Sequence, residues 1–215
     1  MDLKLPRIYP ITDVRISGIS QAGQVERLIA GGAEVIQLRE KYASSGEFYA
    51  SAKQALEIAR KSGVRIIINN RVDIALALKA DGMHLGQDDM PPEKAREILG
   101  DEAIIGFSTH SIEQVHNALD LPIDYVAIGP IFQTRTKENP YAVVGLAGLR
   151  AVRGMAGNIP LVAIGGINTG NLRSVFDAGA DSAAMIGAIL SDPANIKERI
   201  YTFMSLSGHE ILKDI

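Results

Sequence analysis

Eight short apolar runs recur along the chain, and this recurrence constrains the fold more than any other feature of the sequence. The segments between them carry apolar residues at helical spacing, as in Phe48, Ala52, Ala55 and Ala59. Near-continuous apolar strands that alternate with helices predict a parallel sheet covered by helices on its faces. The runs are RIYPIT (7–12), VIQLRE (35–40), RIIINN (65–70), GMHLG (82–86), IIGFST (104–109), YVAIGP (125–130), IPLVAIGG (159–166) and SAAMIG (182–187).

The chain length narrows this class to one architecture. Eight strand-and-helix units of roughly 27 residues fit a (β/α)₈ TIM barrel, although such barrels typically need ~250 residues and this chain has 215. The alternative is an open, doubly wound sheet, but no Gly-x-Gly-x-x-Gly follows the first run, which weakens a dinucleotide-binding version. We therefore predict a single compact TIM-barrel domain over residues 1–215.

Composition excludes several classes of function. The sequence has no cysteine, which rules out disulfides, thiolate catalysis and zinc–cysteine sites. A formal net charge of −3 argues against a general nucleic-acid surface. The N-terminus lacks the apolar region of a secretion signal and no run reaches eighteen apolar residues, so we expect a cytoplasmic protein without membrane contact. The sequence is compatible with either a monomer or a homo-oligomer.

In a TIM barrel the chemistry lies at the carboxyl ends of the strands, and polar side chains gather there. Gln37, Arg39 and Lys41 alternate with Ile36 and Leu38, so one face would be polar and the other would pack on helices. A strand that simply runs out into solvent explains the same pattern. An arginine fork beside a lysine point charge nevertheless suits a phosphate or diphosphate group.

Most other predicted strands also end in polar residues or glycines, whereas the first ends weakly, with Thr12 and Asp13. Gly165 and Gly166, with the later Ile186–Gly187 pair, lie where TIM barrels often bind phosphate through backbone N–H groups. Relief of crowding at strand ends explains these glycines equally. The other polar residues are Asn69, Asn70, His84, Gln87, Asp88, Asp89, Ser108, His110, Thr134, Arg135, Thr136 and Lys137.

The acidic pair Asp88 and Asp89 has two interpretations. A carboxylate beside a diphosphate is the usual protein contribution to a Mg²⁺ site. With Pro91 and Pro92 close behind, Asp89 could instead cap the next helix. Other metal and hydrolase chemistry is disfavoured, since no His-x-x-x-His pair exists and the GFSTH segment lacks the glycine of a nucleophile elbow.

Taken in order, the segments QLREK, INNRVDIALALKADGMHLGQDD, GFSTHS, DYVAIGPIFQTRTK and IPLVAIGGIN resemble the thiamine-phosphate synthase family over nearly the whole chain. The resemblance implies a (β/α)₈ fold and a Mg²⁺-dependent transferase of thiamine biosynthesis. It implies two small-molecule substrates, a hydroxymethylpyrimidine diphosphate and a hydroxyethylthiazole phosphate. The products would be thiamine monophosphate and pyrophosphate.

The resemblance also assigns residues to roles. It implies that Arg39, Lys41, Ser108 and Lys137 are catalytic, and that Asn70 and Asp89 hold the metal. The implied substrate-binding residues are Gln37, Leu38, Arg39, Glu40, Lys41, Asn69, His84, Ser108, Thr134, Arg135, Thr136, Lys137, Gly166, Ile186 and Gly187.

Two positions depart from the family pattern. Asn70 stands where the family usually has an aspartate that binds the metal, and Gly187 stands where a serine is common. Two other functions therefore stay open: a related thiazole tautomerase that uses His110, or a barrel that binds thiamine precursors without catalysis. Retention of Lys41 and of TRTK (134–137) favours the synthase, because a tautomerase has no pyrophosphate to expel.

Overall fold

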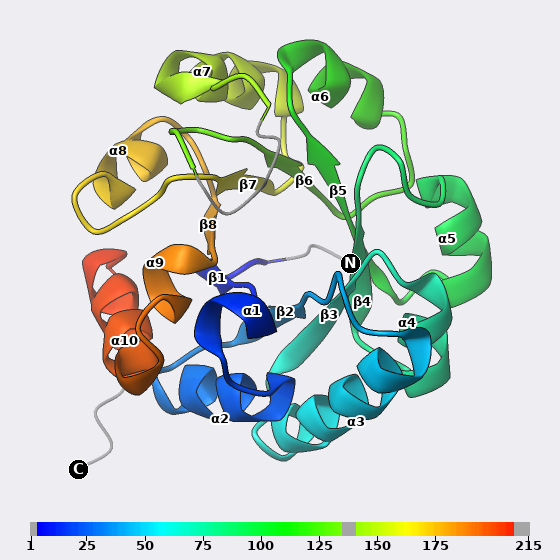
Figure 1. Ribbon diagram of the computed structural model, residues 1–215. Coiled ribbons are helices and arrows are strands. Elements are labelled where there is room, and N and C mark those ends of the chain that lie inside the picture. Colours follow the sequence, from blue (N-terminus) through cyan, green and yellow to red (C-terminus); the bar gives the residue numbers. More distant parts are fainter. Residues whose placement is uncertain (1–3, 135–140, 209–215) are drawn as a thin grey trace.

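The computed structural model describes residues 4–134 and 141–208 and shows all eight predicted strands, arranged in a ring with helices around it (Figure 1). Each strand lies within its predicted run. Their bounds are β1 Ile8–Pro10, β2 Val35–Leu38, β3 Arg65–Asn69, β4 Gly82–Leu85, β5 Ile104–Thr109, β6 Tyr125–Ile128, β7 Leu161–Ile164 and β8 Ser182–Met185.

The helices form the outer layer of the ring in Figure 1. α3 begins with a capping box, in which Ser44 and Glu47 satisfy each other's backbone N–H groups. The helices are α1 Val14–Ser17, α2 Gln21–Ala30, α3 Ser45–Lys61, α4 Val72–Leu78, α5 Pro92–Leu99, α6 Ile112–Ala118, α7 Gly145–Ala156, α8 Leu172–Asp177, α9 Gly187–Leu190, the 3₁₀ helix η1 Pro193–Asn195 and α10 Ile196–Leu206.

The sheet is parallel throughout, in the order β1-β8-β7-β6-β5-β4-β3-β2. The ring closes between β1 and β2 through a single bridge that pairs Ile11 with Gln37. At this seam the Thr12 N–H donates to the Gln37 carbonyl at 2.9 Å, and the Thr12 hydroxyl donates to the same oxygen at 3.2 Å. The arrangement confirms the predicted (β/α)₈ barrel.

Alternate residues of each strand face two different packing layers. Ile36 and Leu38 are fully buried in the large cluster between sheet and helices, as their spacing predicts. A smaller cluster fills the inside of the ring and consists of Tyr9, Ile11, Val35, Ile67, Tyr125, Ala127, Val162 and Ala184. β2 ends at Leu38, so Arg39 and Lys41 lie in the loop that follows the strand.

Within residues 4–134 and 141–208, no helix combines the length and apolar character that a membrane span requires.

Candidate active site

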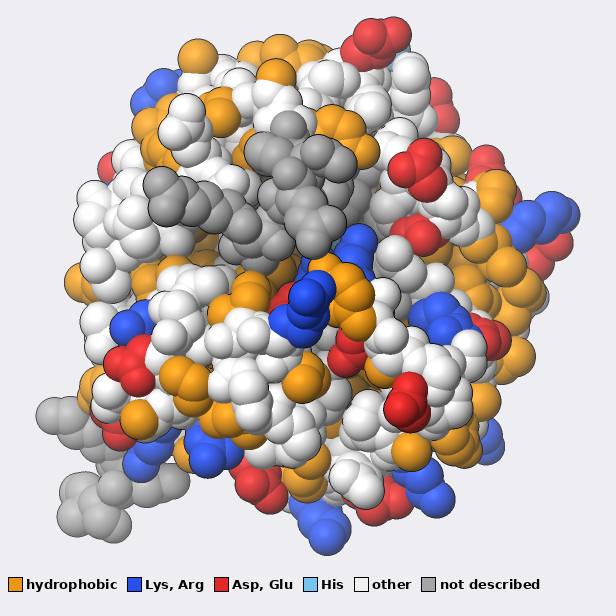
Figure 2. Space-filling model, viewed as in Figure 1, with side chains coloured by type: hydrophobic (Ala, Val, Ile, Leu, Met, Phe, Trp, Pro, Cys, Tyr) orange, Lys and Arg blue, Asp and Glu red, His pale blue; other side chains and the backbone are white. Residues whose placement is uncertain are grey.

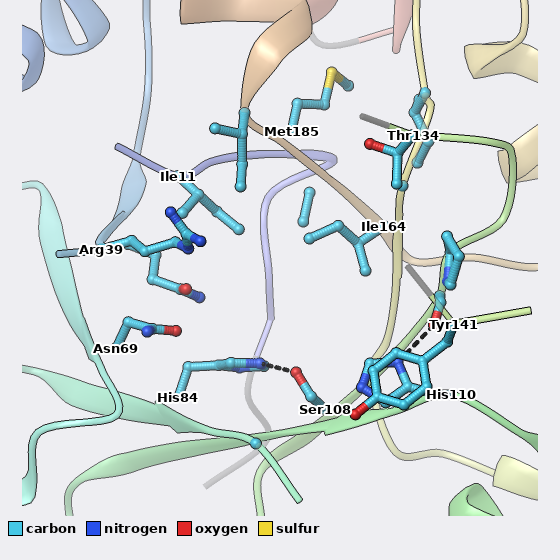
Figure 3. A pocket seen from close by; sticks show the side chains of 18 of the residues that line it. Ile11, Arg39, Asn69, His84, Ser108, His110, Thr134, Tyr141, Ile164 and Met185 are labelled. Atoms are coloured by element: carbon cyan, nitrogen blue, oxygen red, sulfur yellow. Dashed lines mark hydrogen bonds between the residues drawn. The ribbon is translucent and has the colours of Figure 1, made fainter. Parts of the chain in front are cut away.

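A cavity of about 630 Å³ opens at the carboxyl ends of the strands. Figure 2 shows this face of the molecule, with basic side chains near its middle next to hydrophobic ones. Residues from all eight strands or from the loops after them line the cavity, as expected for the reactive end of a barrel. Figure 3 shows ten of the lining residues labelled by name.

Most of the predicted site residues line this cavity. Leu38 does not, because its side chain is buried under the helices. Glu40 instead lines a smaller neighbouring hollow, and its carboxylate accepts hydrogen bonds from the backbone N–H groups after it. Arg135, Thr136 and Lys137 lie outside the described residues. The predicted residues that line the cavity are Gln37, Arg39, Lys41, Asn69, Asn70, His84, Asp89, Ser108, Thr134, Gly166, Ile186 and Gly187.

Arg39 is fixed at the cavity wall by the loop after β1. Its guanidinium forms an ion pair with Asp13, and its backbone N–H donates to the Thr12 hydroxyl at 3.1 Å. The Gln21 amide donates to the Arg39 carbonyl at 2.9 Å. Because backbone and side chain are both held, Arg39 presents its guanidinium to the cavity in a defined place. Preorganised donors of this kind stabilise anions without further rearrangement.

Asp13 serves two elements at once. One carboxylate oxygen accepts hydrogen bonds from the N–H groups of Arg15 and Ile16 and so caps α1, while the other oxygen pairs with Arg39. Asp13 is only 6% exposed. Neither Thr12 nor Asp13 is among the residues that line the cavity, in keeping with the weak strand end that the sequence indicated. Asp13 nevertheless acts on the site through its ion pair with Arg39.

A chain of hydrogen bonds crosses the inside of the barrel below the cavity. The Gln37 amide donates to the Tyr9 hydroxyl at 3.2 Å, and this hydroxyl lies 3.0 Å from that of Tyr125. The Tyr125 hydroxyl lies 2.9 Å from His84 Nδ1. His84 Nε2 lies 2.7 Å from the Ser108 hydroxyl (Figure 3). This series of hydrogen bonds thus ends at Ser108, which lines the cavity.

Burial determines the charge state of these groups. Desolvation, with a further contribution from His110, lowers the pKa of His84 to about 4, so this imidazole is neutral at pH 7. Desolvation raises the pKa of Tyr9 to about 12 and holds that of Tyr125 well above its ordinary value. Both phenols and the imidazole therefore act as neutral hydrogen-bonding groups rather than as acids or bases.

His110 contributes a second imidazole to the cavity wall. Its Nδ1 lies 2.7 Å from the Gly129 carbonyl, which can only accept, so Nδ1 carries the hydrogen. The ring stacks on Tyr141 with 3.6 Å between centroids (Figure 3). This hydrogen bond and stacking fix both the tautomer and the orientation of the ring.

On the opposite wall, the loops after β6 and β7 approach each other closely. Gly165 and Gly166 have φ of 101° and 66°, which disfavour any other residue. A Cβ on Gly165 would lie 2.6 Å from Pro130, and one on Gly166 would lie 2.4 Å from the Gln133 carbonyl. Relief of crowding thus accounts for both glycines, and the same absence of side chains leaves their backbone open to the cavity.

Asn70 and Asp89 both line the cavity, at the ends of β3 and β4. Asn70 has φ of 64°, a left-handed conformation that asparagine and aspartate tolerate better than other non-glycine residues. Asp89 accepts a hydrogen bond from the Gly86 N–H at 2.6 Å, whereas α5 receives no side-chain cap. The alternative of Asp89 as a helix cap is therefore wrong. Amide and carboxylate oxygens are donors that suit Mg²⁺.

Among the described residues, no group of three or more histidine, aspartate or glutamate side chains is arranged to hold a metal ion.

Comparison with known proteins gives one consistent result. The family described as thiamine monophosphate synthase matches residues 8–189. The thiamine-phosphate synthase of Chloroflexus aurantiacus is 44% identical over 186 residues, which cover 86% of this chain and 85% of the relative. That of Koribacter versatilis is 44% identical over 209 residues, covering 95% and 97%.

The chain belongs to the thiamine-phosphate synthase family. A solved thiamine phosphate pyrophosphorylase from Pyrococcus furiosus superposes with a TM-score of 0.85 at 35% identity, covering 94% of this chain and 95% of that one. A 3-hexulose-6-phosphate synthase superposes with a TM-score of 0.65 at 17% identity and shows the same fold alone. The family resemblance of the sequence is confirmed.

The motifs of the sequence did not identify three residues that shape the site, namely Tyr9, Asp13 and Tyr125. The two tyrosines lie in apolar runs and read there as core residues. A signal was present: both occupy the inward face of their strands, where a buried phenol needs a hydrogen-bond partner.

Proposed function

We propose that this chain catalyses the reaction for which its relatives are named. It would join 4-amino-2-methyl-5-(diphosphooxymethyl)pyrimidine to hydroxyethylthiazole phosphate and release pyrophosphate and thiamine monophosphate. The observation that carries the proposal is the family match along residues 8–189, with relatives at 44% identity over most of both chains. The cavity supports it, because basic and amide side chains line one wall and glycines line the other.

The reaction exchanges one bond for another. The C–O bond to the diphosphate breaks with its electron pair on the leaving oxygen, which leaves a cation on the pyrimidine methylene carbon. The thiazole nitrogen then gives its lone pair to that carbon and forms the C–N bond. No covalent enzyme intermediate is required, which agrees with a sequence that has no cysteine.

The residues of this chain would act by charge and position. Arg39, held by Asp13, and Lys41 at the same end of β2 would stabilise negative charge on the departing diphosphate. We assign the same role to Lys137. The thiazole phosphate would lie against Gly166, Ile186 and Gly187, where backbone N–H groups can approach its oxygens. Holding both substrates in one cavity places the nucleophile next to the carbon it attacks.

Mg²⁺ would add positive charge at the diphosphate, and Asn70 and Asp89 are the residues that would hold it. With a single carboxylate between them, we expect weak metal binding by the free protein and firm binding when diphosphate oxygens complete the ligand set.

Incubation with both substrates and Mg²⁺ tests the proposed reaction directly. We expect pyrophosphate and thiamine monophosphate to appear in equal amounts, the first measured by a phosphate assay coupled to added inorganic pyrophosphatase and the second by chromatography. Lys41→Ala should lower the rate, while Lys53→Ala, an exposed lysine on α3, serves as the matched control. A wild-type rate equal to that of buffer would overturn the proposal.

The tautomerase alternative has one observation in its favour, the oriented His110 at the cavity wall. Incubation with the thiazole phosphate isomer alone separates it from the synthase. Isomer conversion that His110→Asn abolishes, without pyrophosphate release in the full reaction, would support the tautomerase. Saturable binding of both precursors without either reaction would support a barrel that binds without catalysis.

A further inference from the structure

The buried hydrogen-bond chain from Gln37 to Ser108 has a direction. A neutral imidazole donates from one nitrogen and accepts at the other, and each hydroxyl donates a single hydrogen. Tyr9, Tyr125, His84 and Ser108 are joined end to end, so fixing one hydrogen in the chain fixes all the others.

Gln37 sets that direction. Its Nε2 donates to the Tyr9 hydroxyl, so Tyr9 passes its own hydrogen to Tyr125, and Tyr125 passes its hydrogen to His84 Nδ1. In the reverse direction the Tyr9 hydrogen would find no acceptor within the chain, inside the barrel at a residue that is 1% exposed. A buried donor left without a partner is unfavourable.

A glycine in β5 leaves the space that these hydrogen-bonded side chains need. Tyr125 comes from β6 and His84 from β4, so the tyrosine has to reach across the strand between them. β5 offers Gly106 there, and a Cβ on Gly106 would lie 1.9 Å from the Tyr125 ring. The His84 and Tyr125 rings stack with 5.5 Å between centroids and 24° between planes. Ring stacking and hydrogen bonding with Tyr125 thus fix the position of the His84 ring.

We propose that Tyr125, backed by Tyr9, is a positioning residue that keeps the hydrogen of His84 on Nε2 and so makes Ser108 a hydrogen-bond donor to the substrate. With Nε2–H donating to the Ser108 oxygen, the hydroxyl hydrogen of Ser108 has to leave the chain, and Ser108 lines the cavity. The Ser108 hydroxyl can therefore donate its hydrogen to an acceptor in the cavity. In the proposed reaction, on which this inference rests, that acceptor is an oxygen of the diphosphate ester rather than the amino group of the pyrimidine.

The tautomer of His84 can be measured without any substrate. Long-range ¹⁵N–¹H correlation spectra of labelled protein distinguish Nδ1–H from Nε2–H in a neutral ring, and His84→Gln assigns the signal among the four histidines. We expect Nε2–H for His84 in the wild type at pH 7.5. We also expect a measurable Nδ1–H fraction in Tyr125→Phe, where Nδ1 loses its donor. A wild-type ring with Nδ1–H would overturn the proposal.

Kinetics give a second test through a double-mutant cycle. Tyr125→Phe and Ser108→Ala should each lower kcat, by about threefold to tenfold for the loss of one hydrogen bond. If Tyr125 acts through Ser108, Tyr125→Phe should change kcat little in the Ser108→Ala background. Multiplicative effects of the two substitutions would contradict this. Tyr201→Phe, on α10 at 44% exposure, is the control for loss of a phenol.

The two tests separate this inference from the proposed function. Tyr9→Phe offers an independent variant if Tyr125→Phe folds poorly, because it breaks the same chain one step earlier. If the wild-type protein shows the Nε2–H tautomer but makes no thiamine monophosphate, the positioning role of Tyr125 is supported and the proposed function is wrong. If it makes thiamine monophosphate with His84 in the Nδ1–H tautomer, the proposed function is supported and the positioning role is wrong.

Discussion

Among the described residues, mainly polar and charged side chains line the cavity on the β2–β5 side, whereas backbone and apolar groups predominate on the β6–β8 side. We call these the side-chain wall and the backbone wall. Figure 3 shows this division, with Arg39, Asn69 and His84 on one side and Ile164 and Met185 away from them. The first side offers charge and directed hydrogen bonds, and the second offers close approach. Substitutions should therefore act through lost charge on one side and through steric conflict on the other.

The largest effect should follow from removing the charge on the side-chain wall. Arg39→Ala should lower kcat/KM for the pyrimidine diphosphate by about 10²- to 10³-fold, the usual loss when a preorganised donor to developing charge is removed. The thiazole KM should change far less. Steady-state kinetics with each substrate varied in turn measures both, with Arg27→Ala on α2 as control. Equal losses for the two substrates would contradict the division of the cavity.

A pH effect should also be confined to the side-chain wall. The pKa of His84 is about 4 in the fold and near 6.5 in the unfolded chain, so the unfolded state binds the extra proton between these values. Stability from neutral His84 is thus fully present above pH 6.5 and is lost as pH falls toward 4, by about 3 kcal/mol in total. Urea unfolding of wild type and His84→Gln across this range should show the flatter profile in the variant.

The backbone wall should respond to added bulk. Gly166→Ala places a Cβ 2.4 Å from the Gln133 carbonyl at φ of 66°, so the loop has to move. We expect the KM for the thiazole phosphate to rise about tenfold and stability to fall by about 1–3 kcal/mol. Gly154→Ala, inside α7 with open space at its Cβ, is the matched control. A raised KM for the pyrimidine diphosphate alone would reverse the two walls.

The smallest effect should come from restoring a carboxylate next to Asp89. Asn70→Asp is conformationally mild, because aspartate also tolerates the left-handed region. The added charge should lower the Mg²⁺ concentration for half-maximal rate by about tenfold or less, since partly exposed charges interact through a high effective dielectric. Calorimetric Mg²⁺ titration without substrate should show firmer binding than in the wild type. Asn117→Asp, which adds a carboxylate at an exposed position of α6, is the matched control. Unchanged affinity would place the ion elsewhere.

The sequence predicted the scaffold well because barrel strands carry their signal locally. Each short apolar run is largely buried on both faces, and each contains an observed strand. The alternation of Ile36 and Leu38 with Gln37 also gave the correct faces. These features depend on residues a few positions apart, which is the range in which periodicity is informative.

The site was less predictable where residues act through distant partners. Asp13 meets Arg39 across 26 positions, and Tyr9 meets Tyr125 across 116. No local spacing connects such pairs, since ring closure brings them together. Leu38 and Glu40 show the converse problem: they lie within the basic motif, but the pleat turns one away and a loop draws the other aside.

The single bridge between β1 and β2 gives the barrel an uneven resistance to local opening. The other junctions are held by three or four paired residues, whereas this one depends on Ile11, Thr12 and Gln37. In the proposed reaction, a substrate that contacts Arg39 on one side and Ile186 or Gly187 after β8 on the other would span this junction. Amide hydrogen exchange at Thr12 and Arg39 should slow when substrate binds, because the bound substrate would stabilise the β1–β2 junction against local opening.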